Sequence, residues 1–252
     1  SDLSKRNAFG TMKEDVMRRD FTFNALYYCP KQEYLYDYVG GFDDVLDKKI
    51  APIMPIDRIF IDDPVRIIRA IRYSMITGFS IKGKLLKYIR TDASGLKQIS
   101  SSRLTEEILK ILKSGKSGKI FEFFLRHNTL SFLLPNMHTV LTEEPAFFER
   151  MKRRKKFLEN LHELDKKLQR GKEIPKGEVF TSWIKSFISI DEDANRDELE
   201  LQYKEVFRTI KHLIQPITPP NKDVEQAVRT IFKDHGLSPP KKRRYGKARK
   251  KK

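Results

Sequence analysis

The sequence predicts an α+β protein, with a small β-hairpin unit in the first sixty residues and a mostly α-helical body after it. Of its 252 residues, 39% are hydrophobic and 34% are charged, which suffices for a core beneath a heavily charged surface. Residues 33–39 alternate in polarity and are rich in tyrosine, which is typical of a strand. From about residue 62, apolar residues recur at helical spacing instead.

The N-terminal unit rests on short signals. Residues 21–28 fit a short helix or a strand, because periodicity does not decide for so short a run. Residues 33–39 are predicted to be a strand that Gly40 and Gly41 end. Residues 48–54 are predicted to be the second strand, so we expect a hairpin-like unit over residues 33–54.

The first helix of the body has clear end signals. Asp62 or Asp63 suits the N-cap, Pro64 suits the first helical position, and Gly78 suits the C-terminal end. Further helices are predicted over residues 82–91, 102–113, 120–127, 145–172, 200–213 and 223–233. Residues 180–190 form the most apolar stretch of the C-terminal half, and the end of the chain is predicted to be a disordered tail.

Charge identifies the class of partner. The net charge is +17, and residues 241–252 contribute +9 of it, so +8 of the +17 remains for the rest of the chain. A chain this basic predicts a polyanionic partner. Nucleic acid is favoured over an anionic membrane, because the tail has neither an apolar face nor a lipidation signal. The tail residues predicted to bind RNA are Lys241, Lys242, Arg243, Arg244, Lys247 and Arg249.

Other residue types exclude several classes of site. The single cysteine, Cys29, rules out a disulfide framework and a cysteine zinc site within the chain, and it fits a reducing, cytoplasmic setting. The five histidines lack the spacing of metal ligands. No apolar run approaches the length of a transmembrane helix.

An acidic residue followed by an arginine ladder is the first motif with chemical content. Asp63, Arg66, Arg69 and Arg72 are spaced three apart, which keeps them on one slowly drifting helix face. An aspartate beside an arginine offers an acceptor and a fork of donors, which can recognise a base edge. The remaining arginines can neutralise a triphosphate. Alone, the spacing fits a solvated face with one Asp–Arg pair equally well.

Two further blocks stand upstream of this ladder. The first is Arg18-Arg19-Asp20-Phe21-Thr22-Phe23-Asn24-Ala25-Leu26, in which Asp20 would serve equally well as a helix N-cap. The second places Gly40 and Gly41 among the carboxylates of residues 37–44, which also fits an ordinary turn. Only the order of the three blocks along the chain is specific.

In this order the blocks resemble the class II family of poly(A) polymerases and tRNA CCA-adding enzymes, and most of all its bacterial poly(A) polymerases. The resemblance is dense over residues 4–135 and weaker up to about residue 240. It implies a truncated nucleotidyltransferase head at residues 1–60 and a helical nucleotide-recognition neck at 61–138. A helical RNA-binding body at 139–240 and the basic tail at 241–252 would follow.

The resemblance also implies a role for each motif residue. Asp20 would be a catalytic carboxylate, Arg19 would contact the incoming nucleotide, Asp63 and Arg66 would be the amino-acid template for the base, and Arg69 and Arg72 would lie near the phosphates. The segment 101–107 would brace the template helix. A capped helix with an internal Arg103–Glu107 pair fits that segment equally well.

The family's metal-binding part is not found upstream of Arg18. Neither a Gly-Gly-x-x-x-Arg-Asp loop nor an Asp-x-Asp pair occurs there. Phosphoryl transfer depends on metal electrostatics, so we expect a fragment of an active enzyme or a decayed one, with most Mg²⁺ ligands outside this chain. The implied parent activity is transfer of AMP from ATP to RNA 3′ ends. CCA addition to tRNA and a catalytically dead RNA-binding module remain the alternatives.

Overall fold

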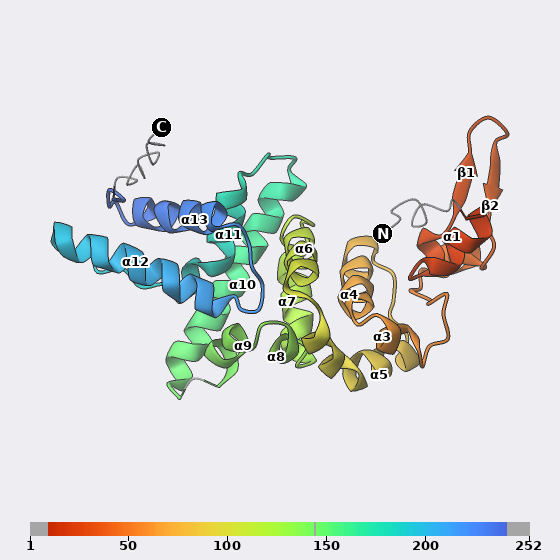
Figure 1. The fold of residues 1–252 in the computed structure, drawn as a ribbon, viewed down its shortest axis with the longest axis horizontal. Helices are drawn as coiled ribbons and strands as arrows, with labels where there is room; N and C mark the ends of the chain where they lie inside the picture. Colours follow the sequence, from red (N-terminus) through yellow and green to blue (C-terminus); the bar gives the residue numbers. More distant parts are fainter. Residues whose placement is uncertain (1–9, 144, 241–252) are drawn as a thin grey trace, which may run out of the picture.

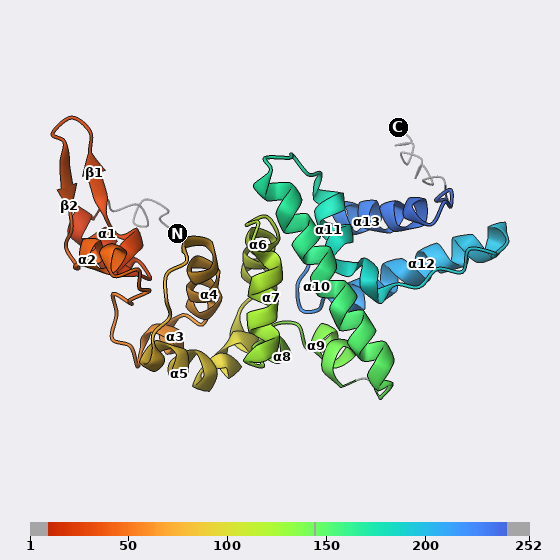
Figure 2. The same ribbon diagram turned by 180° about the vertical axis from the view of Figure 1, so that it is seen from behind.

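The computed structural model describes residues 10–143 and 145–240, in which a small head at one end is joined to a chain of packed helices (Figure 1). The two-stranded sheet lies at one end of the molecule, and α12 (Arg196–Leu213) and α13 (Asn221–Asp234) lie at the other (Figure 2). The structure confirms the α+β class. The tail at residues 241–252, with its six predicted RNA-binding residues, lies outside the described residues.

The head begins with helix α1 (Met12–Arg18), whose N-terminus is closed by a reciprocal capping box between Thr11 and Glu14. A short 3₁₀ turn, η2 (Thr22–Asn24), follows. Strands β1 (Tyr27–Cys29) and β2 (Tyr34–Tyr36) then pair antiparallel, with Tyr27 opposite Tyr36. The ambiguous segment 21–28 therefore contains both a helical turn and a strand.

The prediction that residues 48–54 pair with the 33–39 strand is wrong. β2 pairs with β1 instead, and residues 48–54 make only isolated bridges, Lys49 to Ser80 and Phe21 to Pro52. The reason is helix α2 (Gly41–Leu46), which the sequence did not predict. The carboxylate of Asp37 accepts from the backbone N–H groups of Val39, Gly41 and Phe42 and so starts a helix where a hairpin turn was expected.

Helices make up the rest of the described chain. They are α3 (Ile59–Asp62), α4 (Val65–Thr77), α5 (Gly83–Thr91), η3 (Ala93–Gln98), α6 (Ser101–Leu112), α7 (Ser117–Arg126), α8 (Leu130–Leu133), α9 (Pro135–Thr142), α10 (Phe147–Gln169), α11 (Lys176–Ile184) and η4 (Lys185–Phe187), followed by α12 and α13. Each predicted helix of the body is present. The sequence missed four helices of the body, α3, α8, α9 and α11. Of these, α9 begins at a proline that occupies its first turn.

The beginning of α4 differs by one residue from the prediction. Asp63 ends α3, and Pro64 rather than Asp62 or Asp63 is the N-cap of α4. The Asp63 carboxylate nevertheless accepts from the Val65 N–H at 3.3 Å. Gly78 ends the helix in the left-handed conformation at φ 77°, as predicted.

One continuous core joins the head-proximal helices to the rest of the molecule. Ile67, Ile68 and Ile71 of α4 are fully buried in it, and so are Phe121 of α7 and Trp183 of α11. Burial of the isoleucine stripe fixes the rotation of α4 about its axis, so its arginine ladder faces the head. None of the described helices is long and apolar enough to cross a membrane.

Candidate nucleotide-binding site

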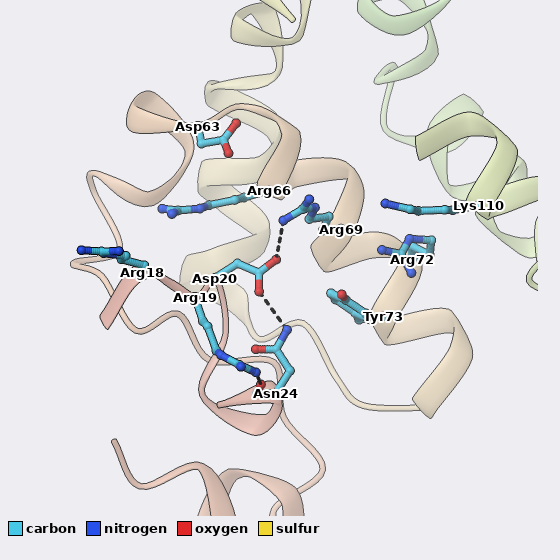
Figure 3. A pocket seen from close by; sticks show the side chains of 10 residues that line it. All are labelled: Arg18, Arg19, Asp20, Asn24, Asp63, Arg66, Arg69, Arg72, Tyr73 and Lys110. Carbon is cyan, nitrogen blue, oxygen red and sulfur yellow. Dashed lines mark hydrogen bonds and ion pairs between the residues drawn. The ribbon is translucent and has the colours of Figure 1, made fainter. Parts of the chain in front are cut away.

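A polar cavity of about 350 Å³ lies between the Arg18–Asn24 segment of the head and α4 (Figure 3). Six cationic side chains less two carboxylates give its lining a net charge of +4. The lining residues are Arg18, Arg19, Asp20, Asn24, Asp63, Arg66, Arg69, Arg72, Tyr73 and Lys110. The structure thus brings together all six residues that were predicted for the nucleotide site, from two segments far apart in the sequence.

Asp20 lies at the centre of this cavity and is only 6% exposed. Its Oδ1 accepts from Asn24 Nδ2 at 2.8 Å and from the Phe21 N–H at 3.2 Å. Its Oδ2 pairs with Arg69 Nη1 at 3.4 Å, which links the head directly to α4. A buried carboxylate needs such partners, and these three contacts hold the Asp20 side chain in one orientation.

The Gly40-Gly41 block anchors the segment that carries Asp20. The buried Asp44 accepts from Thr22 Oγ1 at 2.5 Å and pairs with Lys49 at 2.7 Å. A Cβ atom at Gly41 would lie 2.3 Å from the Thr22 carbonyl oxygen, so only glycine fits there. This block is therefore more than an ordinary turn, because it holds the backbone two residues beyond Asp20.

Two pKa shifts agree with these contacts. Hydrogen bonds to Asp44 and then Asp47 raise the pKa of the Lys49 ammonium to about 12. Partial burial opposes ionisation of Asp37, but the N–H groups of Phe42, Val39 and Gly41 outweigh it and lower the pKa of that carboxyl. Asp37 is therefore ionised at neutral pH, and its negative charge interacts favourably with the positive N-terminal end of α2.

Glu107 of α6 holds two arginines of the ladder in place. Although only 2% exposed, its carboxylate accepts from Arg69 Nε at 3.3 Å and from Arg72 Nη2 at 3.4 Å. Lys110 contacts the same carboxylate at 3.2 Å. Burial of Arg69 lowers its pKa, but the charges of Glu107 and Asp20 outweigh burial and raise it. Arg69 and Arg72 are thus both held by one buried carboxylate.

Arg103 of α6 contacts Asp63 rather than Glu107. One guanidinium nitrogen, Nη2, lies 2.8 and 3.1 Å from the two oxygens of the Asp63 carboxylate. Both members of the alternative Arg103–Glu107 pair are therefore directed at the α3–α4 region, and α6 braces α4 through ion pairs. Arg66 shares the cavity with Asp63 and directs Nη1 to the Met54 sulfur at 2.7 Å.

Arg19 is held by its neighbours in the head. Its guanidinium donates to Asp15 at 3.0 Å, to the Asn24 carbonyl at 2.6 Å and to the Tyr27 hydroxyl at 2.9 Å. Hydrogen bonds from Tyr27 and then Arg19 lower the pKa of Asp15. A ligand at Arg19 would have to share these donors.

Four lining residues were not predicted. Arg18 and Asn24 belong to the first block, and Tyr73 follows the last ladder arginine directly, so the motifs contained a local signal for each of these three. Lys110 comes from a different helix, and only its position three residues after Glu107 could have indicated it.

The described residues do not form a metal site by themselves. Across residues 10–143 and 145–240, no group of three or more His, Cys, Asp or Glu side chains could hold a metal ion. Both Asp20 oxygens already have partners in Asn24 and Arg69. The side chains that line this cavity therefore do not fit a metal ion by themselves.

Comparisons with known proteins agree with the arrangement. Residues 1–51 match the "Poly A polymerase head domain". Residues 78–141 match the "Probable RNA and SrmB-binding site of polymerase A". The Asp20 region and Lys110 of α6 lie within these matches, whereas the lining residues at 63–73 lie between the two matched segments.

Two similar proteins are enzymes that are named for adding nucleotides. Poly(A) polymerase I of Haemophilus influenzae is 36% identical over 151 residues, which is 59% of this chain and 33% of that protein. The A-adding tRNA nucleotidyltransferase of Aquifex aeolicus is 33% identical over 129 residues, which is 49% of this chain and 15% of that protein. This chain thus spans about a third or less of these two relatives.

A solved structure supports the fold. The CCA-adding enzyme of Bacillus stearothermophilus in complex with CTP matches with a TM-score of 0.50 at 18% identity, over 90% of this chain and 60% of that one. At this identity the similarity concerns the fold alone. Together, the head-domain match, the following segment and the named relatives show that this chain is similar to poly(A) polymerases and tRNA nucleotidyltransferases, as the order of the three motif blocks predicted.

Proposed function

We propose that this chain is the nucleotide-recognising and RNA-contacting part of an enzyme that transfers AMP from ATP to RNA 3′ ends. The observation that carries the proposal is the cationic cavity in which Asp20, Asp63 and the α4 arginines converge. In this proposal residues 1–60 belong to the head, 61–138 form the nucleotide-recognition domain, and 139–240 form an RNA-binding body.

The arginine ladder would bind the triphosphate. Arg69 and Arg72 are oriented by Glu107 and retain further N–H groups for phosphate oxygens, because a guanidinium has five donors. Arg18 and Lys110 add positive charge to the same cavity. Binding a polyanion here would offset the repulsion among six neighbouring cations.

Asp63 and Arg66 would recognise the base. The base-pairing edge of adenine presents an amino donor beside a ring-nitrogen acceptor, which complements a carboxylate beside a guanidinium. Arg103 would keep the Asp63 carboxylate in one orientation. Arg19 and the buried Asp20 would lie next to the reacting end of the nucleotide, with Asp20 as the acidic group that this chain supplies.

CCA addition to tRNA is the second candidate. Cytosine also presents an amino donor beside a ring-nitrogen acceptor, so the same Asp63–Arg66 pair would accept CTP. A poly(A) polymerase with this pair would have to exclude CTP by the size and shape of the cavity. The basic tail favours poly(A) addition over CCA addition.

Calorimetric titration of the whole chain with ATP, CTP, GTP and UTP tests the proposal. We expect ATP to bind more tightly than UTP. Asp63→Ala should reduce that difference by about 1–3 kcal/mol, the usual size for a lost bidentate base contact. Asp57→Ala, which removes an exposed carboxylate shortly before α3, is the matched control.

Each other outcome has a definite meaning. Equal affinity for ATP and CTP, both dependent on Asp63, would favour the CCA-adding alternative. Failure of all four triphosphates to bind would overturn the nucleotide site and leave a catalytically dead RNA-binding module.

A further inference from the structure

An exposed aromatic and basic surface at the beginning of α10 is not explained by the nucleotide cavity. Phe147 and Phe148 are 56% and 84% exposed, and their rings contact edge to face at 5.6 Å between centroids. Met151 beside them is 49% exposed. Residues 147–156 also carry six cations and a single carboxylate. We call this segment the α10 patch.

Four exposed side chains of the α10 patch follow one helix face. Phe148, Lys152, Lys155 and Lys156 are spaced by four, seven and eight residues, which places them on a common stripe about 12 Å long. Phe157 lies on the opposite side and is fully buried. The core therefore fixes the helix rotation that turns Phe148 and the lysines to solvent.

The patch is separate from the nucleotide cavity. The N-terminal end of α10 lies beside α9 at an edge of the molecule, with α7 between α10 and α4 (Figures 1 and 2). None of residues 147–156 is among the ten residues that line the cavity.

The chemistry of the patch indicates its occupant. Exposed aromatic rings next to a row of cations suit a single strand, because unpaired bases stack on the rings while phosphates meet the lysines. A membrane-binding helix would continue its apolar face, whereas here lysines replace apolar residues on that face after Met151. A duplex keeps its bases stacked internally and has none to offer to Phe148.

We propose that the α10 patch is an auxiliary binding site for single-stranded RNA, in which Phe148 stacks on one base and Lys152, Lys155 and Lys156 contact the adjoining phosphates. The inference rests on the proposed function, since it names the surface that holds the RNA while its end reaches the cavity. RNA binding and triphosphate binding are measured separately, so the two proposals fail independently.

Fluorescence anisotropy of a labelled twelve-nucleotide oligo(A) titrated with the whole chain tests the stacking. The dissociation constant of Phe147→Ala/Phe148→Ala should rise by about 5-fold to 100-fold, as expected for one lost stacked base. Phe148→Tyr should retain affinity, and Phe148→Leu should lose it. Leu201→Ala, which removes another large exposed apolar side chain, should change nothing. If Phe148→Leu binds normally, the ring does not stack, and a protein or lipid occupant replaces RNA.

A charge-matched pair of variants tests the lysines. Lys152→Gln/Lys155→Gln/Lys156→Gln should flatten the log–log salt dependence of RNA affinity by about 2, at about 0.7 per phosphate contact. Lys166→Gln/Lys172→Gln/Lys233→Gln removes the same charge from exposed positions outside the patch and should leave the slope nearly unchanged. Equal effects of the two triple variants would show that net charge alone matters and would overturn the site.

Discussion

Arg103 on α6 holds both oxygens of the Asp63 carboxylate with a single guanidinium nitrogen, at 2.8 and 3.1 Å. The carboxylate proposed to recognise the base is thereby tied to a different helix from the arginine ladder that follows it. Because the Arg103 side chain is 51% exposed, this pair contributes little to global stability. Its effect is to restrict how Asp63 is presented to the cavity.

Arg103→Met should weaken ATP binding without unfolding the protein. Loss of an exposed charge-assisted contact should cost about 1 kcal/mol, or roughly fivefold in affinity, because Asp63 then samples other rotamers. The ATP affinity of Arg103→Lys should lie between those of the unmodified chain and of Arg103→Met, since an ammonium keeps the charge but lacks the planar fork of a guanidinium. Titration calorimetry measures both, with Arg90→Met on α5 as the exposed control. Unchanged affinity in Arg103→Met would show that Asp63 needs no support.

Glu107→Gln should lower both stability and triphosphate affinity. The substitution keeps the shape of the side chain but removes the charge that faces Arg69 and Arg72. The free energy of unfolding should fall by about 1–3 kcal/mol, because Arg72 loses its carboxylate partner and Arg69 keeps only Asp20. Denaturant unfolding measures this change. Glu106→Gln, one residue earlier and exposed, should be close to neutral, and a loss of similar size there would contradict the assignment.

Gly41→Ala should destabilise the head, whereas Gly83→Ala should not. The new Cβ at position 41 meets the Thr22 carbonyl oxygen at 2.3 Å, but at position 83 it meets nothing within 4 Å. Overpacking of this kind costs about 1–3 kcal/mol. Replacing a glycine by alanine where the backbone allows it gains about 0.4–1 kcal/mol, because the unfolded chain loses conformational freedom. Thermal unfolding should show a lower Tm for Gly41→Ala and a higher Tm for Gly83→Ala. An equal decrease of Tm in both variants would contradict the steric argument.

Stability should decrease as the pH falls below about 6.5, partly through two histidines. Burial, then Arg90 and Arg126, lowers the pKa of His127, and burial lowers that of His138 against the opposing charge of Glu143. The unfolded chain therefore takes up protons first, near the ordinary histidine pKa of about 6.5. The loss is complete only below the folded-state pKa values. His127→Gln/His138→Gln should flatten Tm against pH between about 7 and 5, and an identical slope would refute this account.

The helices were predictable because their signals are local. Gly78 and the apolar periodicity of α4 are readable in the sequence, and that helix alone places Arg66, Arg69 and Arg72 along one side. The hairpin was mispredicted because the choice of a strand's partner depends on distant contacts. No local pattern shows that the Asp37 carboxylate accepts from the first N–H groups of α2 or that β2 pairs with β1.

The same limit applies to the site. Helical spacing suggested that Arg103 and Glu107 face each other on α6, and it holds no information about the packing of α6 against α4. Only the folded chain directs Arg103 to Asp63 and Glu107 to Arg69. Lys110 joins the cavity for the same reason.

The composition of the cavity wall also determines which inhibitors would suit it. Tyr73 supplies its only aromatic face among the ten lining residues, and six of the others are cationic. A neutral, lipophilic compound would have to desolvate these cations without replacing their hydration, which is unfavourable. Fragment screening at this cavity should therefore begin with small dianions such as phosphonates and be extended toward Asp63 with an amino-substituted heterocycle.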